Sequence, residues 1–192
     1  MNVARHLTMA ELEARLDEIR QSPRDEGVLK MIVRRPRTSE REVLEEGELD
    51  PAEGLVGDSW KHRGGSPDAD RQLNIMNSRV IALVAQDKDR WCLAGDQLFV
   101  DLDLSAENLP AGTRLTLGSA VIEVTAPPHT GCKKFVERFG LDAVNFVNSP
   151  LGKQLHLRGI NARVVRAGVI RVGDPVRKTV DAAVVLPRLC LP

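Results

Sequence analysis

Short apolar runs, separated by turns that contain glycine or proline, make up most of the sequence. The first compact run, Val28–Val33, is rich in β-branched residues and lies between Gly27 and Pro36, so it predicts a strand that opens the core sheet. Further strands are predicted over residues 41–49, 71–76, 97–104, 114–117, 120–125, 155–157, 162–166 and 169–172. Because short strands with frequent glycine turns indicate a barrel or a sandwich, the predicted fold class is mainly β (α+β), a β-barrel with a few short helices.

Two of these segments carry more specific signals. Residues 71–76 alternate between polar and apolar side chains, which predicts a strand with one solvent-facing side. The dipeptide Gly118-Ser119 separates residues 114–117 from 120–125 and is typical of a tight hairpin turn. We therefore expect these two runs to pair directly.

Helical spacing is found near the N-terminus and again before the middle of the chain. Thr8 and Glu11 have the form of a capping box, and the apolar residues after them are spaced three or four apart. This pattern predicts an N-terminal helix over residues 9–21. Ser78 is expected to cap a second helix that runs to Gln86.

The 192 residues suit one domain with extensions. We predict an N-terminal helical extension over residues 1–26, a barrel domain over residues 27–177 and a C-terminal tail over residues 178–192. Residues 50–71 form a loop too long for a simple connector, and such loops are often functional or disordered. There is no alternation of strand and helix, no dinucleotide fingerprint and no phosphate P-loop.

The charge balance limits the classes of partner. The sequence has 27 Lys and Arg residues and 27 Asp and Glu residues, so no overall basic character argues for nucleic acid or for an anionic membrane surface. No apolar run approaches the ~20 residues of a membrane-spanning helix, and the first residues are too charged for a secretory signal. We therefore predict a cytoplasmic protein.

The three cysteines, Cys92, Cys132 and Cys190, are far apart and odd in number, which is not the pattern of a disulfide framework. His129 and Cys132 are spaced like half of a zinc site, but no second close pair follows, so a structural zinc site is not expected. Cys92, between two apolar residues, is most simply a core residue.

Cys132 has the sequence context of a reactive thiol. Two prolines, Pro127 and Pro128, end the preceding strand, and from Cys132 onward the apolar spacing becomes helical. Cys132 thus lies where a loop becomes a helix, next to Lys133 and Lys134, and both surroundings favour the thiolate. The alternative is an inert cysteine packed beneath the helix. Residues 142–147 continue the helical region, which Pro150 and Gly152 are expected to interrupt.

A set of short motifs along the chain, followed by the cysteine, resembles the MOSC family, named for the C-terminal domain of molybdenum cofactor sulfurases. These motifs are Gly57-Asp58, Arg71-Gln72, Gly95-Asp96-Gln-Leu-Phe-Val, Ser105-Ala-Glu107-Asn108-Leu109, Gly112, Leu117-Gly118, Glu123-Val-Thr125 and Cys132. The likeness covers roughly residues 27 to 177. It implies a β-barrel whose single functional cysteine, here Cys132, handles sulfur or ligates molybdenum.

The resemblance also implies partners and a cofactor. Members of the family include sulfur carriers supplied by pyridoxal-phosphate-dependent cysteine desulfurases, and reductases of N-hydroxylated compounds that bind the molybdenum cofactor (molybdopterin). A thiolate is suited to both roles, as an acceptor of sulfane sulfur that becomes a persulfide and as a soft metal ligand. The expected partner is thus a desulfurase or a redox protein, because no flavin or iron–sulfur motif is present.

Further site residues follow from this expectation. The cofactor phosphate requires cationic donors, and Arg71, Lys133, Lys134 and Arg158 are the candidates. His129 is a candidate for hydrogen bonding to the sulfur or for proton transfer, or it only fills the turn. Asp58 and Asn108 match family positions, either as cofactor-binding residues or through loop geometry.

Two other classes of function remain open at this stage. One is a non-catalytic barrel that binds a ligand or a protein, in which Cys132 is buried and unreactive. The other is a cysteine hydrolase with His129 or His156 as its base, although no third orienting group is identifiable.

Overall fold

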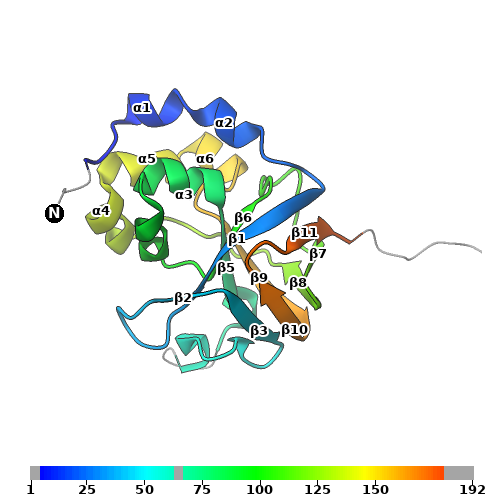
Figure 1. Cartoon of the computed structure of the whole chain (residues 1–192). Helices are drawn as coiled ribbons and strands as arrows, with labels where there is room; N and C mark the ends of the chain where they lie inside the picture. The colour runs from blue at the N-terminus through cyan, green and yellow to red at the C-terminus, as the bar shows by residue number, and fades with distance from the viewer. Residues whose placement is uncertain (1–4, 63–66, 180–192) are drawn as a thin grey trace, which may run out of the picture.

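A closed β-barrel forms the centre of the protein, and a layer of helices covers one side of it (Figure 1). The computed structural model describes residues 5–62 and 67–179. The strands are β1 (Glu26–Arg34), β2 (Glu42–Leu44), β3 (Glu46–Asp50), β4 (Gly54–Leu55), β5 (Leu73–Asn77), β6 (Leu98–Asp101), β7 (Arg114–Leu117), β8 (Ala120–Val124), β9 (Ile160–Arg166), β10 (Gly168–Arg171) and β11 (Pro175–Lys178). The predicted fold class is confirmed.

Seven strands close the barrel. Their order is β11-β7-β8-β9-β5-β6-β1, and β11 pairs back onto β1 to complete the ring, while β2 adds to the outer side of β1. Six of these seven pairings are antiparallel; β5 and β6 are parallel and need a crossover connection. A separate sheet, β10-β3-β4, adjoins the barrel.

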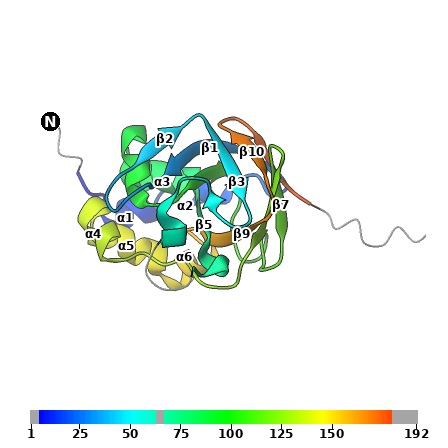
Figure 2. The same cartoon turned by 90° about the horizontal axis from the view of Figure 1, so that it is seen from below.

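The helices are α1 (Met9–Glu13), α2 (Leu16–Arg20), α3 (Ser78–Ala85), α4 (Lys133–Phe139), α5 (Leu141–Asn148) and α6 (Pro150–Gln154), with short 3₁₀ turns η1 (Ser59–His62), η2 (Ala69–Arg71) and η3 (Lys88–Ala94). The crossover between β5 and β6 consists of α3 and η3. Figure 2 shows α4, α5 and α6 following one another along one side of the barrel, away from β7. The α1 and α2 helices lie over this helical layer, on the side remote from β3 (Figure 1).

The barrel strands divide their side chains between two apolar cores. Leu29, Ile75 and Leu98 point into the barrel, whereas Phe99 and Met76, their neighbours in sequence or on the adjacent strand, join the core beneath the helices. Successive strand side chains alternate between faces, so one short strand serves both cores. This corrects the expectation for residues 71–76: β5 is buried on both faces because helices cover its outer side.

Several local predictions are confirmed in whole or in part. Gly118-Ser119 forms the hairpin turn between β7 and β8, with Leu117 opposite Ala120. The capping box of Thr8 and Glu11 is present, although the helix expected over 9–21 is broken into α1 and α2. The helix expected from Ser78 has Asn77 as its N-cap instead, and the Asn77 side chain accepts the amide of Arg79.

Other local predictions are wrong. Pro150 does not interrupt a helix but begins α6 at its first position, with Ser149 as the cap, so residues 155–157 follow a helix and form no strand. Residues 41–49 form two strands, β2 and β3, and β11 lies in a segment where we predicted none. Of the tail predicted over residues 178–192, all residues after Thr179 lie outside the described part of the chain, as does Cys190.

Candidate functional site

Cys132 is the N-cap residue of α4, at the end of the loop that leaves β8, and its side chain is exposed. The loop is fixed immediately before it. The Asn148 side chain accepts the Gly131 amide at 2.9 Å and donates to the Gly131 carbonyl at 3.1 Å. The predicted position of Cys132, at a loop-to-helix junction, is confirmed, and its exposure contradicts the alternative in which it is buried.

A cavity of about 660 Å³ opens beside Cys132. Its lining includes six cationic side chains and neither aspartate nor glutamate among the described residues. The cationic residues are Arg35, Arg37, Arg41, Lys134, Arg138 and Arg158; the remaining lining comes from Thr38, Ser39, Ser59, His62, Asn74, Ala94, Gly95, Phe135 and Cys132 itself. A cavity with lining of one charge sign attracts ligands of the opposite sign, so this one selects anions.

Three consecutive carbonyl groups at the end of η3 position three of the arginines. Leu93 O accepts from Arg138 Nη1, Ala94 O accepts from Arg158 Nη2 at 3.0 Å, and Gly95 O accepts from Arg35 Nη1 at 2.6 Å. Gly95 ends η3 in the left-handed conformation with φ of 90°, which glycine adopts without strain. The turn thus holds three guanidinium groups, from Arg35 directly after β1, from α4 and from the α6–β9 connection.

Arg35 is neutralised by a buried carboxylate. Asp58 forms a bidentate pair with it, with Nε to Oδ2 at 2.8 Å and Nη2 to Oδ1 at 3.0 Å, and also accepts the Arg35 backbone amide. The two side chains are 4% and 0% exposed. Asp58 therefore supports Arg35 from behind and is not itself among the residues that line the cavity.

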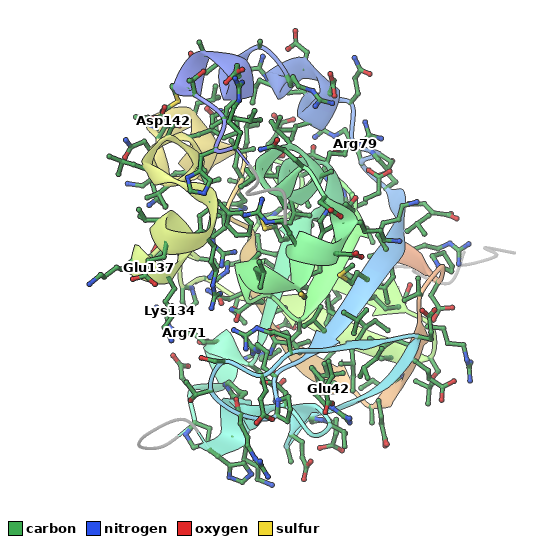
Figure 3. The ribbon with its side chains drawn as sticks, turned by 60° about the vertical axis from the view of Figure 1, so that its left-hand side comes forward. Glu42, Arg71, Arg79, Lys134, Glu137 and Asp142 are labelled. Carbon is green, nitrogen blue, oxygen red and sulfur yellow. The ribbon has the colours of Figure 1, made fainter. Side chains whose placement is uncertain are left out.

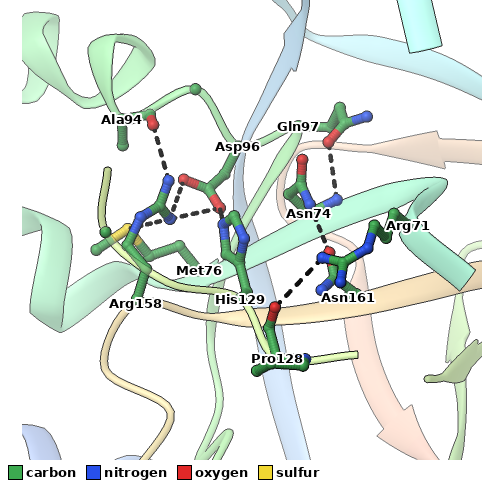
Figure 4. A network of polar contacts seen from close by, with 12 residues as sticks. Arg71, Asn74, Met76, Ala94, Asp96, Gln97, Pro128, His129, Arg158 and Asn161 are labelled. Carbon is green, nitrogen blue, oxygen red and sulfur yellow. Dashed lines mark hydrogen bonds and ion pairs between the residues drawn. The ribbon is translucent and has the colours of Figure 1, made fainter. Parts of the chain in front are cut away.

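Arg158 is neutralised in the same way by Asp96 (Figure 4). Arg158 Nη1 lies 2.8 Å and 2.9 Å from the two carboxylate oxygens, and His129 Nε2 lies 2.9 Å from Oδ1. Burial alone would raise the pKa of Asp96, but Arg158 and His129 outweigh this effect and lower the pKa to about 2. Asp96 is thus an anion, and His129 donates to it from Nε2.

The pKa of His129 is lowered by burial and by the nearby charge of Arg158, against the opposing influence of Asp96. The ring is consequently neutral at pH 7. Since Nε2 is engaged with Asp96, the histidine anchors the loop that leads to Cys132. His156, the other histidine considered as a base, contacts the carbonyl of Leu104 through Nδ1. Neither histidine has a hydrogen bond to Cys132 in the described part of the chain.

Arg41, Lys134 and Arg138 differ from the paired arginines, because none of them forms an ion pair with a described carboxylate. Arg41 Nε is buried and has no hydrogen-bond partner in the part of the chain that the structure describes. Burial, followed by repulsion from Arg138 and Arg35, lowers the pKa of the Arg41 guanidinium. A methyl group placed on Gly95 would lie 3.9 Å from both Arg41 Nη2 and Arg138 Nη1, so both guanidinium groups lie near Gly95.

The structure brings only part of the predicted set together. Cys132, Lys134 and Arg158 line one cavity. Lys133 is exposed and does not line it. Arg71 is half exposed and donates to the Pro128 carbonyl at 3.4 Å, so it braces the loop that carries His129 (Figure 4). Figure 3 shows Lys134 and Arg71 on the same side of the molecule, Lys134 extending from α4.

Asn108 lies elsewhere. It is 3% exposed, and its amide donates to the carbonyls of Arg24 and Asp103 and accepts from Lys178. It does not line the cavity, and these bonds give it a role in loop geometry.

Sequence reasoning missed Arg35, Arg41 and Arg138 as cavity residues, Asp96 as the partner of Arg158, and Asn148 as the residue that fixes Gly131. Asp96 was visible within the motif Gly95-Asp96, but nothing in the sequence connected it to Arg158 or to His129. The arginines are scattered along the chain, and only the fold brings them around Gly95.

A scan against protein families matches the MOSC domain model to residues 61–177, which is more than half of the chain. The chain belongs to the MOSC domain family. Solved structures with the same fold include the YuaD protein from Bacillus subtilis, with a TM-score of 0.57 and 17% identity over 79% of this chain and 94% of that one. YiiM from Escherichia coli has a TM-score of 0.53 and 19% identity over 80% of this chain and 70% of that one. No curated protein matches the sequence.

MOSC domains are generally linked to the molybdenum cofactor or to sulfur handling. All of the motifs quoted from the sequence except Gly57-Asp58 lie within the matched residues. The described residues include no group of three or more His, Cys, Asp and Glu side chains placed to hold a metal ion. None of the helices in the described ranges is long and apolar enough to span a membrane.

Proposed function

We propose that this MOSC protein binds the molybdenum cofactor or carries sulfur as a persulfide, with Cys132 as the functional thiolate in both cases. The observation that supports the proposal is the exposed Cys132 sulfur at a cavity that the described residues line with six cationic and no acidic side chains. An anionic ligand that reacts with, or is ligated by, a thiolate fits both features. A non-catalytic binding module explains the charge but gives no role to the exposed cysteine.

The residues present fit the molybdenum cofactor. Its phosphate needs several donors, and Arg41 has a buried Nε without a partner among the described residues. Arg41, Arg138 and Lys134 would hold the phosphate, while the soft Cys132 thiolate would be the protein ligand of the metal. When bound, the cofactor supplies oxygen-atom and electron transfer of the kind needed to reduce N-hydroxylated compounds.

The chain's own residues prepare the site for this chemistry. Asn148 fixes Gly131, and Asp96 fixes His129, so the loop before Cys132 is held at two points. Asp58 and Asp96 keep Arg35 and Arg158 in place without occupying the cavity. A persulfide would form on the same exposed sulfur, with a pyridoxal-phosphate-dependent desulfurase as donor, and a reductase would need a redox partner.

The test compares wild type with Cys132→Ala and, as a matched control, Cys92→Ala. Cys92 is half-buried at the edge of the helical core and does not line the cavity. Protein from a host that makes the cofactor is measured for molybdenum and for persulfide mass, and assayed with an N-hydroxylated substrate. We expect wild type and Cys92→Ala to carry molybdenum or persulfide and Cys132→Ala to carry neither. Equal content and equal activity in all three would overturn the proposal.

A further inference from the structure

The positive charge around the Cys132 cavity exceeds what the carboxylates of the described residues neutralise. Of its six cationic side chains, Arg35 and Arg158 are paired with buried carboxylates and Arg37 lies 3.8 Å from Glu40. Arg41, Lys134 and Arg138 have no carboxylate partner in residues 5–62 and 67–179. Three positive charges are therefore available to a ligand and to the thiolate.

The positions of the arginines indicate the chemical class of the ligand. Arg41 Nε is buried without an acceptor among the described residues, and Arg41 Nη2 and Arg138 Nη1 each lie 3.9 Å from the position that a methyl group on Gly95 would take. Guanidinium groups that lie near one residue in this way suit a compact oxyanion with several acceptor oxygens, because each fork donates two hydrogen bonds. The Phe135 ring also lines the cavity, and the Arg158 guanidinium lies 4.9 Å from the centre of that ring.

We infer that the low-molecular-weight sulfur donor of Cys132 is a dianion of the thiosulfate type, a sulfane sulfur bonded to a sulfonate group. This inference rests on the sulfur-carrying form of the proposed function and names its substrate class. A dianion and a thiolate together bring three negative charges, which equals the number of unpaired cations at the cavity. Without those cations the two anions would repel each other and the reaction would be slow.

The reaction balances without another reactant. The Cys132 thiolate attacks the terminal sulfur of thiosulfate, a new sulfur–sulfur bond forms on the cysteine, and the bond between the two sulfurs of thiosulfate breaks. The electron pair of that bond leaves with sulfite. Thiolate and thiosulfate carry three negative charges, as do the persulfide anion and the sulfite dianion, so no proton or oxidant is consumed. Arg41 and Arg138 stabilise the charge that develops on sulfite.

The experiment incubates the purified full-length protein with thiosulfate and follows persulfide on Cys132 by mass spectrometry together with released sulfite. We expect one sulfite per persulfide and no reaction with Cys132→Ala. Arg41→Gln and Arg138→Gln should each lower the second-order rate about tenfold, because each removes a charged hydrogen bond. Arg20→Gln, which removes a guanidinium paired only with the exposed Asp17, should react at the wild-type rate.

Two further arms test the charge argument. Methanethiosulfonate, a monoanion that also yields a persulfide, should react with a smaller dependence on Arg41 and Arg138 than thiosulfate does. Arg138→Lys keeps the charge and should recover part of the rate lost in Arg138→Gln. Circular dichroism of each variant identifies any that has lost its fold.

The outcomes separate this inference from the function on which it rests. If thiosulfate gives no persulfide while a cysteine desulfurase with L-cysteine loads Cys132, the donor class is wrong and the sulfur-carrying function stands. If neither donor loads Cys132 and no molybdenum is bound, the proposed function also fails. Equal rates in wild type, Arg41→Gln and Arg138→Gln would overturn the role of the unpaired arginines.

Discussion

Arg35 and Arg158 line the same cavity as Arg41 and Arg138, but the two sets of arginines are held differently. The first two are 4% and 6% exposed, and each is paired with a carboxylate that is 0% exposed. The second two have no described carboxylate partner, and they are fixed mainly by backbone carbonyls, Glu40 O for Arg41 and Leu93 O for Arg138. The first set is neutralised by buried carboxylates, whereas the second set has no counterion in the described ranges.

This difference separates arginines that stabilise the structure of the site from arginines that bind its ligand. A buried arginine with a bidentate carboxylate has little capacity left for a ligand, and its removal is expected to affect folding. An arginine without a counterion lowers the stability of the ligand-free protein, but it strengthens the binding of an anion. The largest effects on stability and on anion affinity should therefore arise from different residues.

Asp96→Asn should have the largest effect, because it leaves Arg158 buried without a counterion. Breaking a buried ion pair by removing one partner costs about 3–5 kcal/mol of unfolding free energy. Urea denaturation measures the change. Asp17→Asn is the control, since Asp17 is 85% exposed in its pair with Arg20 and should change stability by less than about 1 kcal/mol. Similar losses of stability in the two variants would show that the buried Arg158–Asp96 pair is not a structural one.

Arg41→Gln and Arg138→Gln should show the opposite behaviour. We expect each to lower the affinity for inorganic phosphate about tenfold, because a charged hydrogen bond is lost. Stability should change by less than about 0.5 kcal/mol or rise, since repulsion between like charges is relieved. Isothermal calorimetry and thermal unfolding measure the two quantities. A large loss of stability in either variant would place it with the structural arginines.

Asn148→Ala tests how firmly the loop before Cys132 is held by the Asn148 side chain. The variant loses two hydrogen bonds to Gly131, so its free energy of unfolding should fall by about 1–2 kcal/mol. Hydrogen exchange of the Gly131 amide should accelerate as well. Asn145→Ala lies on the same helix with an exposed side chain and provides the matched control. Unchanged exchange at Gly131 would mean that the loop is fixed by other contacts.

The His129 pKa predicts a smaller effect that depends on pH. Burial and Arg158 lower this pKa, so below about pH 6.5 the unfolded chain binds a proton that the folded protein does not. The contribution to stability is therefore complete above pH 6.5 and is lost as the pH falls toward the folded pKa. Thermal unfolding at pH 7.5 and 5.5 should show a steeper decline for wild type than for His129→Gln. Parallel declines would contradict the depressed pKa.

The smallest expected effect is the difference in phosphate affinity between Lys134→Gln and Lys133→Gln. Lys134 lines the cavity and Lys133 does not, although both are exposed. An exposed ionic contact is worth at most about 1 kcal/mol, so Lys134→Gln should weaken phosphate binding about twofold to fivefold. Lys133→Gln should leave it unchanged. The reverse order, measured by calorimetry, would show that Lys133 and not Lys134 faces the ligand.

The barrel could be predicted because its signals are local. Alternation and glycine turns indicated the strands, Gly118-Ser119 indicated the hairpin, and the change of spacing at Cys132 indicated the start of α4. The error at residues 155–157 is local as well. There Leu155 and Leu157, on either side of His156 and shortly before Gly159, resembled a strand, whereas Ser149 and Pro150 had already started a helix.

The anion site could not be predicted in the same way, because its contacts join distant parts of the chain. Arg35 lies 60 residues from Gly95, and Arg158 lies 62 residues from Asp96. Neither charge nor spacing distinguishes Arg41 or Arg138 from the other arginines in the sequence. Lys134 was selected because it adjoins Cys132, and the same reasoning selected Lys133, which the fold turns away from the cavity.

The position of β1 in the ring has a practical consequence for shortened versions of this protein. A fragment cut at Lys61, where the family match begins, would lack the strand that joins β6 to β11. Its two neighbours would then be left as open edges, a known cause of aggregation. Such a fragment would also lose Arg35 and Arg41, so recombinant work on the pocket has to retain the preceding segment.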